Sequence, residues 1–249
     1  MLLLGCSSAA PVSPAVPKGT LTSDAVYAAV GASETVGFGI SDHALALRAA
    51  WPQLFFNEAL GLGATYYNFA IPGATAAIGL SVEAPEAIAV RPTVVSVILG
   101  SNDLLHGVPV AQFESDLEGT VGELSQGGRA VVLLANLFPL NDLPGVLACL
   151  PGAANPSECV LNGEPGGAAG AGVTSLAQLD SLLDAFNAAV AAVAEREGAV
   201  LVDLASQGAV LAAHPEYLAP DGFHPSPQGA AAIAAMFAAA YRAHRGDSP

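Results

Sequence analysis

The chain has 249 residues, of which 53% are hydrophobic, so one α/β domain with a sizeable core can account for all of it. Only 7 Lys and Arg stand against 22 Asp and Glu, which gives a formal net charge of −15. A chain this acidic is repelled by phosphate backbones and by anionic membrane surfaces, and it carries no basic stripe. The composition therefore argues against nucleic-acid binding and against electrostatic docking on anionic lipids.

The N-terminal segment 1–22 reads as a tether in front of the domain. An apolar run ending in Leu4-Gly5-Cys6 resembles a bacterial lipobox, in which Cys6 would be lipidated after cleavage. The run is very short, no basic residues precede it, and Leu4 replaces a smaller residue, so a disordered tail with an incidental cysteine is the alternative. The lipobox interpretation predicts an exported protein, membrane-anchored, periplasmic or extracellular. The alternative leaves a cytoplasmic location open.

Five short runs predict buried strands, at 25–31, 65–71, 93–100, 130–137 and 199–205. They are rich in Val, Ile, Leu or aromatic residues, and most lack polar alternation, as expected for a sheet covered on both faces. Helical patterns fall between or after them, from Pro52 to Gly61 and at 108–124, 174–198 and 227–245. Strands alternating with helices predict a flavodoxin-like parallel sheet with right-handed crossovers, in a three-layer α/β/α sandwich.

We assign residues 23–246 to a single domain of this kind. The segment 138–172, rich in Pro, Gly and Asn, is predicted to be a loop insertion rather than a second domain. Cys149 and Cys159 lie ten residues apart in this segment. They predict a local disulfide, which would imply an oxidising, exported setting, and two unpaired thiols are the alternative.

Ser33 lies in the stretch GASETVGFG, directly after the first predicted strand. It does not fit the G-x-S-x-G elbow of common serine hydrolases, because the residue two positions later is Thr35. A serine hydroxyl is a poor nucleophile unless a base accepts its proton. The question is therefore which histidine can reach it.

His224 is the best candidate for that base, because Asp221 precedes it by three residues in a tight Pro- and Gly-rich turn. Such a carboxylate can hold the imidazole in one tautomer and stabilise its protonated form. The turn comes after the last strand and before the last helix, so it can reach the same edge of the sheet as Ser33. No equally persuasive setting surrounds the other histidines: His43, His106, His214 and His244.

Acyl transfer also needs hydrogen-bond donors for the developing oxyanion. Gly73 follows the second strand and allows a close backbone approach with a free N–H. Asn102 follows the third strand and offers a side-chain amide. With the backbone N–H of Ser33, these residues predict three donors at three successive strand ends.

Taken in chain order, Ser33, Gly73, Asn102 and His224 resemble the four motif residues of the SGNH (GDSL-type) hydrolase superfamily. The resemblance extends from about residue 27 to residue 243 and includes a Gly-x-Asn-Asp block at 100–103 and an Asp-x-x-His block at 221–224. It implies the SGNH hydrolase fold. It also implies that Ser33 is the nucleophile, His224 the base and Asp221 its partner, with the Ser33 backbone, Gly73 and Asn102 as the oxyanion hole.

The first block departs from the family pattern, because Gly-Asp-Ser-Leu is here Gly31-Ala32-Ser33-Glu34. The lost Asp removes a carboxylate beside the nucleophile, although Asp221 still completes the triad. Glu34 adds a charge where the family has Leu.

These features predict a serine esterase or lipase-like hydrolase that works through an acyl-enzyme on short- to medium-chain acyl esters, without a cofactor or metal. Lysophospholipids and acetylated sugars also fall within what the family hydrolyses. The alternatives are a carbohydrate O-deacetylase and a non-catalytic glycan- or lipid-binding module. Phe38, Phe69 and Ile78 favour an apolar acyl pocket unless they belong to the core. We interpret Glu83 as a solvated surface charge.

Overall fold

The computed structural model describes residues 24–161 and 172–246, so Cys6 and the tether lie outside the described residues. Five parallel strands form one sheet in the order β2-β1-β3-β4-β5. The strands are β1 (Val26–Gly31), β2 (Thr65–Asn68), β3 (Val94–Ile98), β4 (Val131–Ala135) and β5 (Val200–Val202). All five predicted strands are present, and each is shorter than its hydrophobic run.

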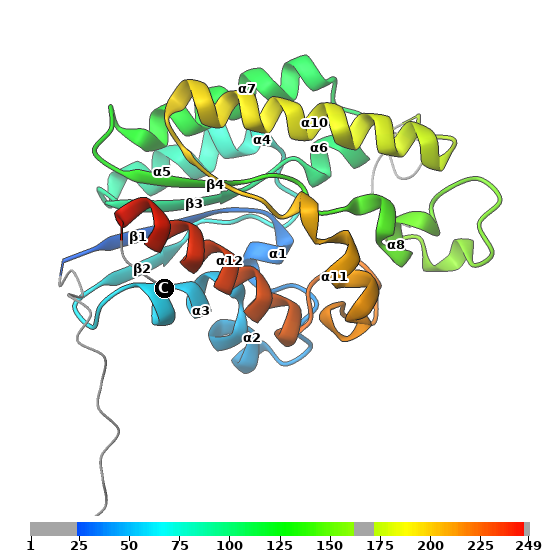
Figure 1. The fold of residues 1–249 in the computed structure, drawn as a ribbon, viewed down its shortest axis with the longest axis horizontal. Helices are drawn as coiled ribbons and strands as arrows, with labels where there is room; N and C mark the ends of the chain where they lie inside the picture. The colour runs from blue at the N-terminus through cyan, green and yellow to red at the C-terminus, as the bar shows by residue number, and fades with distance from the viewer. Residues whose placement is uncertain (1–23, 162–171, 247–249) are drawn as a thin grey trace, which may run out of the picture.

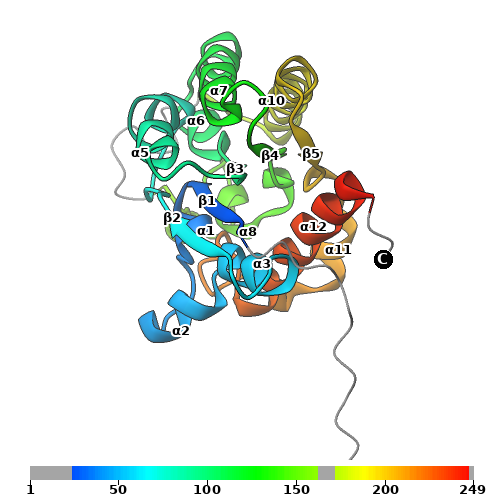
Figure 2. The same cartoon turned by 90° about the vertical axis from the view of Figure 1, so that its left-hand side faces the viewer.

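Helices cover both faces of the sheet, which confirms the predicted three-layer sandwich (Figures 1 and 2). One face carries α4 (Ala76–Ile78), the π-helical turn η1 (Gly79–Glu83), α5 (Ala84–Ala89), α6 (Ser101–Leu105), α7 (Val110–Ser125) and α10 (Leu176–Glu197). The other face carries α2 (His43–Ala49), α3 (Trp51–Ala59) and α12 (Pro227–Arg245). Short elements lie near the carboxyl edge: α1 (Ser33–Val36), η2 (Leu140–Asp142), α8 (Pro144–Leu147), η3 (Pro156–Glu158), η4 (Ala205–Gln207), α11 (Gly208–Ala213) and η5 (Pro215–Tyr217).

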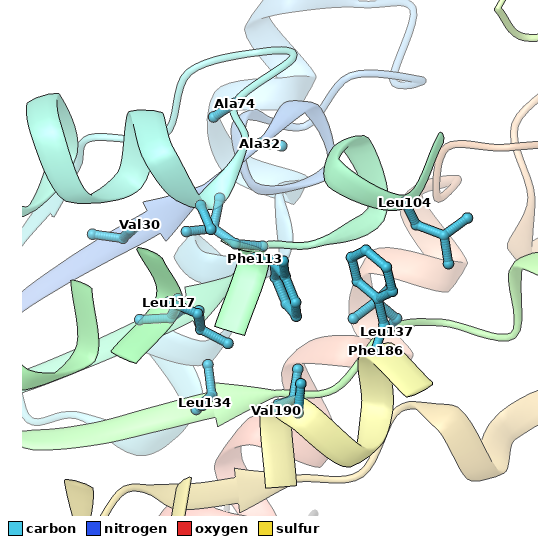
Figure 3. Packing of buried hydrophobic residues seen from close by; sticks show 14 of the residues in the cluster. Val30, Ala32, Ala74, Leu104, Phe113, Leu117, Leu134, Leu137, Phe186 and Val190 are labelled. Carbon is cyan, nitrogen blue, oxygen red and sulfur yellow. The ribbon is translucent and has the colours of Figure 1, made fainter. Parts of the chain in front are cut away.

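The alternation of side chains along the strands divides the core in two. On β1, Ala28 and Val30 face the α7–α10 side, whereas Tyr27 and Ala29 face the α3–α12 side. Figure 3 shows the first cluster, in which helix and strand side chains interdigitate between the layers. Burial of apolar area on both faces is the main source of stability for a sheet of this kind.

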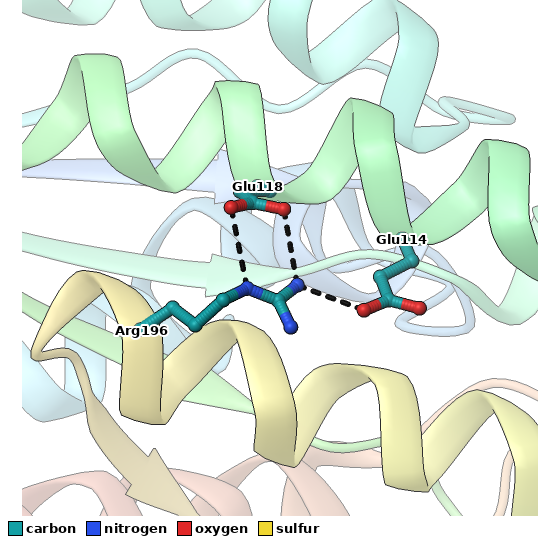
Figure 4. A network of polar contacts seen from close by, with 3 residues as sticks. All are labelled: Glu114, Glu118 and Arg196. Atoms are coloured by element: carbon teal, nitrogen blue, oxygen red, sulfur yellow. Dashed lines mark hydrogen bonds and ion pairs between the residues drawn. The ribbon is translucent and has the colours of Figure 1, made fainter.

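Helices α7 and α10 pack side by side, and ion pairs between their side chains link them at the surface. The Arg196 guanidinium donates to Glu114 at 2.8 Å and to Glu118 at 3.0 Å (Figure 4). These groups are well exposed, so water and salt leave the pairs little net stabilising effect. By length and composition α10 would also suit a membrane span, but here seven of its residues are buried in the core.

The strand order decides where the predicted site residues meet. β1 is flanked by β2 and β3, and all three strands run in the same direction. Their carboxyl ends therefore bring the Ser33 turn, the Gly73 loop and the Asn102 turn to one edge, at the topological switch point where α/β sheets bind ligands.

Candidate active site

Ser33 lies at the first position of α1, directly after β1. Its Oγ is 2.9 Å from Nε2 of His224, and both residues are largely buried. The backbone can make this turn because Gly31 has φ +156°, and a Cβ there would overlap the side chain of Thr35 and the carbonyl of Ile98. Ser33, which does not fit the G-x-S-x-G pattern, thus lies on a different kind of tight turn between a strand and a helix.

The imidazole of His224 is held from its other side by Asp221. The distance from Nδ1 to Oδ2 is 2.6 Å, while Oδ1 accepts the backbone N–H groups of Phe223 and His224 at 3.0 Å each. Burial alone would raise the pKa of Asp221, but these hydrogen bonds outweigh it and lower the pKa below its usual range. The carboxylate is therefore ionised at neutral pH and orients the ring.

The backbone beneath the histidine also has a specific shape. Gly39 has φ +92°, and a Cβ on it would lie 2.7 Å from the Cβ of His224, so no side chain fits there without displacing the imidazole. The ring of Phe38 lies 5.1 Å from the imidazole and shields it on one face. The chain segment after α1 therefore contributes to the position of the base.

Three hydrogen-bond donors lie at the carboxyl edge near Ser33. One N–H of the Asn102 amide donates to the carbonyl of Ala74 at 2.9 Å, and within residues 24–161 and 172–246 the second N–H of Nδ2 has no partner and can bind a ligand. Among the described residues the backbone N–H groups of Ser33 and Gly73 make no hydrogen bond. Gly73 has φ +82° and open space around it, and it does not line the pocket that holds Ser33 and Asn102.

A pocket opens directly on the serine and the histidine. Ser33, Asn102 and His224 line it together with Glu34, and most of its remaining wall is apolar. The apolar wall comes from the loop after β4, from the segment 204–218, and from α12: Phe138, Leu140, Leu143, Leu204, Val210, Leu211, Leu218, Ile233 and Met236. An apolar cavity with a few convergent polar groups is typical of a small-molecule site.

The residues that the sequence suggested for such a pocket are not the ones that form it. Phe69 and Ile78 pack against the core, which is the alternative that their hydrophobicity left open. Phe38 is 56% exposed and lines a separate surface groove beside Asp221. The actual wall is built by segments distant in the chain, which a local pattern does not reveal.

Glu83 is the clearest error of the sequence interpretation. It is not a solvated surface charge but is only 1% exposed, with Oε2 accepting the N–H of Gly31 at 2.9 Å and Oε1 that of Ile71 at 3.0 Å. The sequence does hold a signal, because Ala76, Gly79 and Ala87 lie at three- and four-residue steps from one another through Glu83. This spacing places Glu83 on the inward-facing stripe of the helix, among small residues.

Asp103 is a second buried acid that the sequence analysis did not single out as functional. Both of its carboxylate oxygens accept the N–H of Ala76, at 3.1 and 3.0 Å, and its side chain is fully buried. Burial raises its pKa to about 6, against the lowering effect of these bonds. Together with the bond from Asn102 to Ala74, it fastens the turn after β3 to the loop that carries Gly73.

The described part of the insertion packs against the histidine turn. Cys149 and Cys159 are joined in a disulfide, as the first of the two alternatives predicted. Gly145 donates its N–H to the carbonyl of Gly222 at 3.0 Å, and a Cβ on Gly145 would lie 2.6 Å from the carbonyl oxygen of Asp221. In residues 24–161 and 172–246 there is no cluster of three or more His, Cys, Asp or Glu that could hold a metal ion.

Comparisons with known proteins identify the family and the fold of the chain. The sequence matches the GDSL-like Lipase/Acylhydrolase family over residues 29–232. No curated protein matches it significantly. The solved structures that share its fold include the psychrotrophic esterase EstA from Pseudoalteromonas sp. (TM-score 0.61, 16% identity, 89% of this chain and 99% of that chain). They also include the lipase/acylhydrolase from Enterococcus faecalis (TM-score 0.62, 19% identity, 88% and 96%).

A third relative in fold is Axe2, an acetylxylan esterase from Geobacillus stearothermophilus (TM-score 0.56, 19% identity, 90% of this chain and 95% of that chain). At these identities the structural likeness establishes the fold alone, and the sequence match over most of the chain establishes the family. The predicted resemblance to the SGNH (GDSL-type) hydrolases is thereby confirmed. The chain belongs to the GDSL-like lipase/acylhydrolase family and is a carboxylic ester hydrolase.

Proposed function

We propose that the protein is a serine esterase that cleaves short- to medium-chain acyl esters through an acyl-enzyme. The observation that carries this proposal is the continuous hydrogen-bonded chain from Ser33 through His224 to Asp221, which opens on an apolar pocket. In such a chain the imidazole takes the serine proton as the hydroxyl attacks, and the carboxylate stabilises the imidazolium that forms.

In the first half of the reaction, Ser33 Oγ forms a bond to the ester carbonyl carbon and its proton passes to Nε2 of His224. The developing oxyanion is stabilised by the N–H groups of Ser33 and Gly73 and by the free N–H of Asn102. The tetrahedral intermediate collapses by breaking the bond to the alcohol oxygen, which receives the proton from His224. In the second half, water gives one proton to His224 while its oxygen bonds to the acyl carbon. The bond from that carbon to Ser33 Oγ then breaks, Oγ takes the proton back from His224, and the acid is released.

The pocket wall supports an acyl chain rather than a sugar in this site. Beyond Ser33, Glu34, Asn102 and His224, the polar side chains that line it are few, whereas sugar hydroxyls need many hydrogen-bond partners. A carbohydrate O-deacetylase would use the same machinery and would bind the sugar outside this pocket. A non-catalytic binding module would have no use for a base placed 2.9 Å from a serine hydroxyl.

The test is a hydrolysis profile of wild type and Ser33→Ala over p-nitrophenyl esters from acetate to dodecanoate, together with acetylated xylo-oligosaccharides. We expect wild type to prefer acyl chains of intermediate length and Ser33→Ala to lose the activity. Equal hydrolysis by the two proteins would refute the nucleophile assignment. A preference for acetylated sugars over every acyl ester would favour the deacetylase.

We further propose that the protein is exported and matures in an oxidising compartment. The disulfide between Cys149 and Cys159 supports this location, since such bonds persist outside the reducing cytoplasm. The lipobox-like start would add a lipid anchor at Cys6. Metabolic labelling with a palmitate analogue, compared between wild type and Cys6→Ser, tests the anchor directly.

A further inference from the structure

The turn that carries Ser33 is held by two carboxyl groups, neither of which occupies the position where the family pattern has one. The N–H of Gly31 donates to Glu83 Oε2 at 2.9 Å, and the N–H of Ala32 donates to Glu34 Oε1 at 3.2 Å. The next N–H along the chain, that of Ser33, makes no hydrogen bond among the described residues. Two consecutive peptide groups are therefore fixed immediately before the one that faces the site.

Glu83 also reaches the second loop that supplies a donor. Its Oε1 accepts the N–H of Ile71, and the same N–H also donates to the carbonyl of Gly31 at 3.0 Å. Ile71 precedes Gly73 by two residues. One carboxyl group thus bridges the turn of the nucleophile and the loop of Gly73. Both of its hydrogen bonds within the described part of the chain are to backbone N–H groups, so it fixes the position of the main chain.

Burying a carboxyl group costs free energy, even when it accepts hydrogen bonds from two N–H groups. Glu83 lies in the protein interior without a cationic partner among the described residues. Burial, with a smaller contribution from the nearby carboxyl of Glu34, raises its pKa to about 8 against the lowering effect of the two N–H bonds. The side chain is directed inward by the π-helical turn η1, which ends at Glu83, and such turns recur at functional sites.

Resting on the proposed function, we infer that Glu83 is a positioning residue that sets the oxyanion-binding geometry by fixing the N–H of Ser33 relative to the N–H of Gly73. Glu34 completes the arrangement by accepting the N–H of Ala32, which lies between Gly31 and Ser33. The two glutamates thereby hold the turn in which Ala32 stands where the family has an Asp. Glu83 does not line the pocket, so it acts through the backbone and touches no substrate.

Glu83→Gln and Glu83→Leu separate this role from simple folding. Gln is nearly isosteric with the neutral acid that a pKa of about 8 implies at pH 7, so it adds neither a charge nor a cavity. It keeps one acceptor for two N–H groups, whereas Leu keeps none. The matched control is Glu86→Gln, an exposed acid on the following helical turn.

For each variant, kcat and KM are measured on the best p-nitrophenyl ester, and the concentration of competent enzyme is determined by stoichiometric labelling of Ser33 with a fluorophosphonate. We expect kcat per labelled site to fall ~10-fold in Glu83→Gln and ~10²-fold in Glu83→Leu, because displaced oxyanion donors cost up to ~10²–10³-fold. KM should stay within about twofold, since ground-state binding is not touched. Glu86→Gln should behave as wild type.

The outcomes distinguish this inference from the proposed function. If wild type is not labelled and Ser33→Ala retains full activity, the proposed function is wrong, and the inference about Glu83 is wrong as well. If wild type requires Ser33 but both Glu83 variants retain kcat per labelled site, the inference alone is overturned. It is equally overturned if the loss appears only in KM or only in the labelled fraction, because both results describe a structural or binding role.

Discussion

The Nε2 atom of His224 lies 2.9 Å from the Oγ atom of Ser33, although 191 residues separate the two in the chain. The contact exists because Ser33 directly follows β1 and His224 precedes α12, and both turns lie at the carboxyl edge of the sheet. At this distance the imidazole can accept the proton of the serine hydroxyl directly.

Loss of the base should cost nearly as much as loss of the nucleophile. His224→Gln removes the proton acceptor, and we expect kcat to fall by ~10⁴–10⁶-fold, as in other triads that act as a unit. Asp221→Asn should cost somewhat less, about 10⁴-fold, because it disturbs the orientation of the imidazole and not its presence. Steady-state kinetics over pH 5 to 9 check both values, with Ser33→Ala as the reference. Full activity in His224→Gln would contradict the assignment.

Asn102 should act mainly in the transition state. Its amide has one N–H free for the oxyanion, so Asn102→Ala is expected to lower kcat by ~10²–10³-fold with little change in KM. The variant also loses the bond to Ala74, and thermal unfolding reports that separate structural cost. A Tm shift without a kcat effect would assign Asn102 to the fold and not to the chemistry.

The length of the apolar pocket should determine the preferred acyl chain. Ala232 lines the pocket from α12, so Ala232→Phe fills part of it and should raise KM for octanoate and longer esters much more than for acetate. Ala235→Phe lies on the same helix but is exposed, and it is the matched control. An unchanged chain-length profile in Ala232→Phe would show that acyl chains bind elsewhere.

Glu83 should make stability decrease with rising pH. Its pKa is raised to about 8 in the folded protein from 4.5, so between these values the folded state holds a proton that the unfolded chain releases. The stability due to this proton is fully present below about pH 4.5 and is lost as the pH rises through 8. Asp103, raised to about 6 from 3.8, contributes in the same direction at lower pH.

The measurement is Tm from pH 5 to 9 for wild type, Glu83→Gln and the exposed control Glu86→Gln. Glu83→Gln should show a flatter decline of Tm than wild type between pH 5 and 8, and Glu86→Gln should follow wild type. Parallel curves for all three proteins would mean that Glu83 titrates near its ordinary value.

The disulfide should stabilise both the fold and the wall of the site. Cys149 and Cys159 close a loop with a sequence separation of 10, for which the loss of chain entropy predicts ~2–3 kcal/mol. Reduction should therefore lower Tm by ~5–10 °C. It should also reduce kcat, because Gly145, whose carbonyl accepts the N–H of Val160 next to Cys159, braces the turn of Asp221 and His224. A Cys149→Ser/Cys159→Ser double variant should show the same Tm with and without dithiothreitol. A wild-type Tm insensitive to dithiothreitol would indicate that the bond adds nothing.

Sequence patterns alone were enough to predict the class of the fold and the family, and they nominated the residues proposed to carry the chemistry. Uninterrupted Val- and Leu-rich runs such as β3 and β4 are readable because strands buried on both faces carry no polar alternation. The Asp221–His224 pair can be recognised in the sequence because one tight turn sets the distance between the two side chains. Ser33, Gly73 and Asn102 can be recognised because each follows a predicted strand. The lengths of the strands were predicted less well, because a strand ends where its hydrogen bonds to neighbouring strands end, and a hydrophobic run can continue past that point.

Which side chains surround these residues depends on packing between segments that are far apart in the chain. From sequence, Glu83 is predicted to be a surface charge, because the residues next to it do not reveal its hydrogen-bond partners. Those partners are the N–H groups of Gly31 and Ile71, which lie at or just after the ends of two different strands. The pocket wall likewise combines the loop after β4 with α11 and α12, segments that meet only when the sheet is assembled. Contacts between distant segments depend on how the layers pack, and no local periodicity records that packing.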